Sequence, residues 1–134
     1  MKFLLDTCCI SDFVKGDENT LLHLKSSTPS ELAISSITVM EIEYGLAHNP
    51  QRAKKIEKII SDLLSCLVVL PYTNDDASHT AKIRAILRKV GTPIGSYDIL
   101  IAGTALTHNL VLVTANEKEF ARVPHLKVKN WRLK

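Results

Sequence analysis

Three acidic residues stand where apolar segments of the sequence give way to helical ones. Asp6 closes the apolar segment KFLLD, Glu41 follows LAIS, and Asp98 precedes ILIAG. Clustered carboxylates repel one another unless a cation neutralises them, and Mg²⁺ and Mn²⁺ prefer oxygen ligands. Such an ion can activate water and stabilise charge on a phosphodiester. We therefore take these residues as candidate metal ligands and catalytic residues.

Each of these acids also has a local structural explanation. Asp6 could simply cap the helix that follows it. Thr38 and Glu41 have the T-x-x-E spacing of a capping box, which alone would account for Glu41. The dipole of a helix favours Asp98 in its first turn by roughly 0.3–1 kcal/mol. Burial of a lone charge costs roughly several kcal/mol, so a cation is the natural partner of Asp98 beside its apolar neighbours.

Two further polar residues follow the apolar run LVLVT. Asn116 and Glu119 have the N-x-x-E spacing, which is also typical of a helix start. Alternatively, they act as outer ligands around the same centre. We include both among the candidate catalytic residues.

The elements that would position these residues alternate between strands and helices. The expected strands cover residues 2–6, 32–35, 67–70 and 110–114, with an edge strand around Val128. The expected helices cover residues 11–25 with a break near Gly16, 38–47, 51–65, 74–90 ending at Gly91, 96–107 and 116–121. This order predicts one α/β domain over residues 1–134, with helices on both faces of a parallel sheet. Ligands of such sheets bind at the carboxyl ends of the strands, where the acids stand.

The composition fits a globular protein and excludes several classes. The chain has 134 residues, a net charge of +3 and 46% apolar residues, with no run long enough to span a bilayer and no signal peptide. We expect a cytoplasmic protein. Cys8, Cys9 and Cys66 have no zinc spacing, so we expect reduced thiols, and Asp6 disfavours a thiolate at its neighbours. No nucleotide-binding glycine loop or GxSxG motif occurs.

Several basic residues on the expected helices could contact phosphates. Runs of this kind more commonly form a solvated face, and the two interpretations stay open here. The residues are Lys54, Lys55, Lys58, Lys82, Arg84, Arg88 and Lys89.

Four stretches carry a family resemblance: FLLDTCCISDF, ISSITVMEIEYG, GTPIGSYDILIAGTALTHNLVLVTANEKEFARV and LKVKNW. They resemble PIN-domain ribonucleases, and within them the VapC toxins of bacterial toxin–antitoxin pairs, in the same order and nearly end to end. The resemblance implies a three-layer α/β/α sandwich and a Mg²⁺- or Mn²⁺-dependent endoribonuclease. It also implies a homodimer, and an antitoxin that inhibits it in a hetero-oligomer.

The acidic residues of the family map onto Asp6, Glu41 and Asp98. Its fourth position falls in TANEKEF, where many members carry Asp; here Asn116 stands, with Glu119 three residues on. A neutral Asn should hold a second cation less tightly.

Other matched positions concern the surroundings of the acids. Cys8 stands where many members have Asn after LDT. Thr7 and Thr114 match hydroxyl positions that would orient ligands or water.

On this hypothesis Asp6 and Asp98 hold the principal Mg²⁺, and Glu41 completes the site or takes a proton from the attacking water. Asn116 or Glu119 positions water or a weaker second ion. One alternative is a catalytically weak PIN-fold module that binds RNA or protein, which Asn116 and Cys8 favour. A phosphatase is a further alternative, opposed by the lack of a DxDx[TV] motif.

Overall fold

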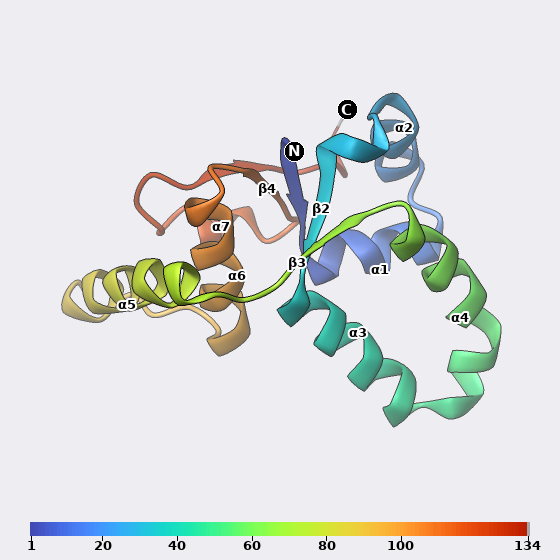
Figure 1. Ribbon diagram of the computed structural model, residues 1–134, viewed down its shortest axis with the longest axis horizontal. Helices are drawn as coiled ribbons and strands as arrows, with labels where there is room; N and C mark the ends of the chain where they lie inside the picture. The colour runs from blue at the N-terminus through green and yellow to red at the C-terminus, as the bar shows by residue number, and fades with distance from the viewer. Residues whose placement is uncertain (134) are drawn as a thin grey trace.

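The computed structural model describes residues 1–133 and has a five-stranded sheet at its centre (Figure 1). The strands run parallel in the order β3-β2-β1-β4-β5. They are β1 (Phe3–Leu5), β2 (Leu32–Ser35), β3 (Val68–Leu70), β4 (Val111–Val113) and β5 (Lys127–Lys129). Every residue of β1 and β2 is buried, because both faces of the sheet are covered by helices.

The helices form two layers, one on each face of the sheet. They are α1 (Thr7–Lys15), α2 (Glu18–Ser26), α3 (Ser36–His48), α4 (Pro50–Ser65), α5 (Asn74–Lys89), α6 (Ser96–Thr107) and α7 (Glu117–Phe120), with a 3₁₀ turn at Pro29–Glu31. Figure 1 shows α5 and α6 on one side of the strands and α1, α3 and α4 on the other.

Alternate residues of the central strand β1 belong to two hydrophobic cores, one on each face of the sheet. Leu4 packs with Ile83 and Leu87 of α5, whereas Leu5 packs with Ile10 of α1 and Ile42 of α3. The predicted α/β/α sandwich with a parallel sheet is therefore confirmed. The expected single domain runs to Lys134, which lies outside the described residues.

Two helices begin earlier than their expected starts at residues 11 and 38. Helix α1 starts at Thr7, because Asp6 caps it directly after β1. Helix α3 starts at Ser36, because the hydroxyl of Ser35 accepts the backbone N–H of Ile37. Strands β1 and β2 thus run directly into α1 and α3 without a loop. This fixes the first turn of both helices at the carboxyl edge of the sheet.

The helix α6 is held tightly against α5. At Gly103, a β-carbon would lie 2.9 Å from the backbone oxygen of Asp76 and would collide with the hydroxyl of Thr80. The two helices therefore approach at a distance that only glycine permits. This contact fixes the helix that carries Asp98.

Two of the compositional expectations concern thiols and membranes. Cys8, Cys9 and Cys66 are all free thiols. Within residues 1–133, no helix combines the length and the apolar character needed to cross a bilayer.

Candidate metal-binding and catalytic site

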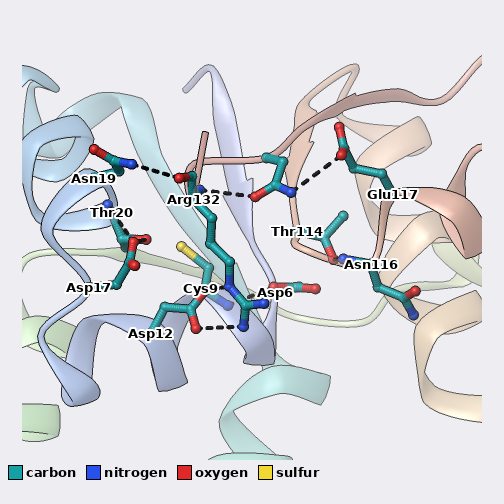
Figure 2. A network of polar contacts seen from close by, with 11 residues as sticks. Asp6, Cys9, Asp12, Asp17, Asn19, Thr20, Thr114, Asn116, Glu117 and Arg132 are labelled. Carbon is teal, nitrogen blue, oxygen red and sulfur yellow. Dashed lines mark hydrogen bonds and ion pairs between the residues drawn. The ribbon is translucent and has the colours of Figure 1, made fainter. Parts of the chain in front are cut away.

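Asp6 lies buried at the carboxyl end of β1, with only 3% of its surface exposed. Its Oδ1 accepts the backbone N–H of Cys9 at 2.9 Å, so the expected helix cap is present. Burial raises the pKa of Asp6 to about 6, outweighing hydrogen bonds from Thr114 and Cys9 that lower it. In Figure 2 its carboxylate points toward Thr114 at the end of β4. A capping role alone does not require this degree of burial.

Glu41 does not form the expected capping box with Thr38. Because α3 starts at Ser36, Thr38 lies inside the helix, where its hydroxyl is buried without a hydrogen-bond partner. The side chain of Glu41 turns instead toward α1, where its Oε1 accepts the hydroxyl of Thr7 at 2.8 Å. Glu41 is thereby attached to the residue that follows Asp6.

Asp98 and Glu119 form a carboxylate pair where α6 and α7 meet. The pKa of Asp98 is raised to about 7 by burial, and by its hydrogen bond and charge contact with Glu119. The pKa of Glu119 is lowered, chiefly because the backbone N–H of Gly95 donates to its Oε1 at 2.8 Å. The pair therefore retains a proton on Asp98 more readily than an isolated carboxylate would.

Asn116 supports Glu119 and does not cap α7. Its side chain makes no capping hydrogen bond, and its Nδ2 donates to Oε2 of Glu119 at 2.8 Å. The backbone N–H of Asn116 donates to the hydroxyl of Thr114 at 3.0 Å. The N-x-x-E spacing thus reflects a side-chain contact that fixes a carboxylate beside Asp98.

The structure brings the sequence-derived acids into one electrostatic neighbourhood. Glu41 raises the pKa of Asp6, and Asp6, Glu41 and Glu119 all raise the pKa of Asp98. None of these acids forms an ion pair, because the one ion pair within residues 1–133 joins Arg132 to Asp12, although the charge of Arg122 reaches Glu119 and lowers its pKa. Several carboxylates without a counter-ion at the carboxyl edge of a sheet are a donor set that suits a divalent cation.

The carboxylates do not converge on a single point. Among the described residues, no three His, Cys, Asp or Glu side chains lie close enough together to hold an ion by themselves. Mg²⁺ usually keeps several waters and takes one or two carboxylates, so the arrangement fits a hydrated ion and not an all-protein cage.

The ion pair of Asp12 and Arg132 was not anticipated from the sequence. Asp12 lies on α1, is 6% exposed, and raises the pKa of Asp6 by its charge. Figure 2 shows Arg132 reaching down to Asp12 while its backbone contacts Asn19. Trp131, directly before it, is buried edge-on against Phe3. These residues are far apart in the sequence and carry no local signal of their contact.

Comparison with known proteins identifies the family. The PIN domain matches residues 3–126 of the chain. This chain belongs to the PIN domain family. It is 37% identical to the tRNA(fMet)-specific endonuclease VapC of Salmonella typhimurium over 131 residues, covering 98% of each chain. It is 36% identical to Ribonuclease VapC2 of Haemophilus influenzae, with the same coverage.

Solved structures of PIN domains have the same fold. DNA-bound VapBC from Salmonella typhimurium aligns with a TM-score of 0.89 at 38% identity and 98% coverage of both chains. FitAcB from Neisseria gonorrhoeae aligns with a TM-score of 0.88 at 27% identity, covering 98% of this chain and 99% of that one.

Cys8 lies on α1 close to the carboxylates of the site. The pKa of its thiol is raised to about 11, by desolvation and then by the charges of Asp6 and Asp98. The expectation that acidic neighbours disfavour a thiolate is confirmed, so Cys8 is a poor nucleophile at neutral pH.

Proposed function

We propose that this PIN domain is a Mg²⁺-dependent endoribonuclease and the toxin of a toxin–antitoxin pair. The observation that carries the proposal is the group of carboxylates at the end of β1 and on α3, α6 and α7, none of which forms an ion pair within residues 1–133. The names of its relatives support an RNA substrate. One relative is named for tRNA(fMet), so initiator tRNA is the first substrate to test.

Asp6 and Asp98 would hold the cation, and Mn²⁺ would serve in place of Mg²⁺ because it prefers similar ligands. When bound, the ion would lower the pKa of a water ligand and neutralise charge on the phosphate. Glu41 accepts a proton from the attacking water, while the hydroxyl of Thr7 fixes its carboxylate. Glu119 keeps its negative charge beside Asp98, because Gly95 and Asn116 donate to it.

The proposed partners follow from the same relatives. The similar structures from Salmonella typhimurium and Rickettsia felis are VapBC complexes, which supports a small antitoxin bound to this chain. We also propose a homodimer, and a hetero-oligomer with the antitoxin. We propose that the protein acts in the cytoplasm, where its RNA substrate would be found.

The test compares Asp6→Asn and Asp98→Asn with the matched control Asp62→Asn, an exposed residue of α4. Cleavage of initiator tRNA is measured with Mg²⁺ and with EDTA, and Mn²⁺ binding is measured separately by paramagnetic resonance. We expect both site variants to lose cleavage and Mn²⁺ affinity while they remain folded, and the control to match wild type. Wild-type rates in Asp6→Asn, or in EDTA, would refute the proposal.

The same assay separates the alternatives. A binding module would retain RNA at saturating Mg²⁺ without cutting it. A phosphatase would release nitrophenol from nitrophenyl phosphate and leave the RNA intact.

A further inference from the structure

A cavity lies on the side of the loop at residues 92–95 that faces away from Asp98. It has a volume of about 480 Å³ and lies between α5 and the first turns of α6. Apolar side chains line its wall, among them Leu87, Ile94 and Ile99, and two arginines, Arg84 and Arg88, stand with them. Cavities of roughly 300–1,000 Å³ that combine apolar walls with a few polar groups are typical of small-ligand sites.

The loop at residues 92–95 separates this cavity from the carboxylates. Pro93, Ile94 and Ser96 line the cavity, whereas Gly95 between them faces the acids. A β-carbon at Gly95 would lie 3.2 Å from Oδ2 of Asp98. The cavity is therefore one backbone thickness away from the proposed reaction centre. The guanidinium of Arg122 donates to the backbone oxygen of Pro93 at 3.3 Å and steadies this loop.

The two arginines are available to a ligand. Arg84 and Arg88 are exposed and stand one turn apart on α5, so their side chains leave the same face of the helix. Neither is in an ion pair with a carboxylate of residues 1–133. Guanidinium groups bind phosphate through paired hydrogen bonds and stack on bases. Without a bound cation the carboxylates across the loop would repel a phosphate, so these arginines supply an attraction that does not depend on the metal.

We propose that this cavity binds the nucleotide next to the scissile phosphate of an RNA substrate. The base lies against Pro93, Ile94 and Leu100, and the phosphate is held by Arg84 and Arg88. A base can enter only when it is unpaired and turned out of its stack, so the preferred substrates are cut in loops or other single-stranded segments. This inference rests on the proposed ribonuclease activity and adds to it the site that selects the RNA.

The first experiment removes the two positive charges. The variant Arg84→Gln/Arg88→Gln is compared with Lys15→Gln/Lys25→Gln, which removes the same charge from exposed positions of α1 and α2. Binding of a fluorescent single-stranded RNA is measured without divalent ions at several salt concentrations. For the arginine variant we expect the slope of log Kd against log salt to fall by about 1.4, and for the control by much less.

The second experiment tests the base contact. An RNA with an abasic nucleotide beside the cleavage point should bind wild type several-fold more weakly than the intact RNA. The variant Ile94→Ala should weaken binding of the intact RNA and have no further effect on the abasic one. Equal losses on both RNAs would place the base elsewhere and overturn the proposal.

The outcomes distinguish this proposal from the proposed function. RNA binding that depends on Arg84 and Arg88, in a protein that never cuts, would support the cavity and refute the ribonuclease. If the arginine variant cuts RNA with the same kcat/KM as the control variant, the result would support the ribonuclease and refute the cavity proposal. If wild type is a dimer and the arginine variant sediments as a monomer, a second copy of the chain occupies this face and the proposal fails.

Discussion

Arg132 holds both carboxylate oxygens of Asp12, with Nε 2.7 Å from Oδ2 and Nη2 2.8 Å from Oδ1. The contact spans 120 positions of sequence and ties the end of the described chain to α1. It also neutralises an acid whose charge reaches Asp6. Arg132 therefore contributes to the electrostatic surroundings of the proposed metal site through its ion pair with Asp12.

Replacement of Arg132 by Met should destabilise the fold. Loss of one partner from a buried pair costs about 3–5 kcal/mol, but half of the Arg132 side chain is exposed, which reduces the expected loss to about 1–2 kcal/mol. The free energy of unfolding in urea measures it. Addition of Asp12→Asn to the variant should recover part of the loss, and a variant as stable as wild type would show that the pair contributes nothing.

The stability of the metal-free protein should fall as pH rises from about 4 to about 6. The pKa of Asp6 is raised from 3.8 to about 6, so across this window the folded chain binds more protons at Asp6 than the unfolded chain does. The stabilising contribution is complete below the unfolded pKa and is lost as pH passes the folded pKa. The raised pKa corresponds to about 3 kcal/mol.

The control for this pH dependence is Asp6→Asn, since Asn still caps a helix but does not titrate. Its unfolding free energy should lack the decline assigned to Asp6. Addition of Mg²⁺ near pH 7 should restore stability to wild type and not to the variant. Parallel pH curves for the two proteins would contradict the assignment.

Replacement of Thr7 by Val should slow cleavage with little change in folding. The hydroxyl of Thr7 fixes Glu41, and its loss frees a group that we assign to proton transfer. We expect kcat to fall about tenfold with KM unchanged, and the unfolding free energy to fall by about 1 kcal/mol. The variant Thr7→Ser keeps the hydroxyl and should recover the rate; if both variants are equally slow, the hydrogen bond is not the cause.

The variant Asn116→Asp should strengthen binding of a second divalent ion. It adds a carboxylate beside Glu119 and removes the amide hydrogens that Glu119 now accepts. We therefore expect a less stable metal-free protein, because two neighbouring carboxylates repel each other, and tighter Mn²⁺ binding in titration calorimetry. Mn²⁺ affinity and stoichiometry identical to wild type would argue against a cation at this position.

The layers of the fold could be predicted because parallel strands that are buried on both faces consist of consecutive apolar residues. The segment around Val111–Val113 is an example. The start of α3 could not be predicted, because Ser35 caps it with no intervening loop. The Thr38–Glu41 spacing was misleading for the same reason. The start of α1 was expected at residue 11 and lies at Thr7, although Asp6 had been considered as a helix cap.

The sequence proposed the candidate site as a set of residues and did not predict the contacts between them. Placement at the end of a strand singled out Asp6, and placement in the first turn of an apolar helix singled out Asp98. The bond from Thr7 to Glu41 joins residues 34 positions apart, and nothing local in either segment encodes it. Only the packing of α1 against α3 brings these two side chains together.

The central position of β1 has a consequence for synthesis of the protein. Phe3 is translated more than a hundred codons before Val111, its neighbour in the sheet. The first strand must therefore wait, unpaired on one edge, until most of the message has been read. A nascent chain released before β4 would carry Asp6 and Asp98 without the strand that closes the sheet beside them, and we expect such a fragment to be inert.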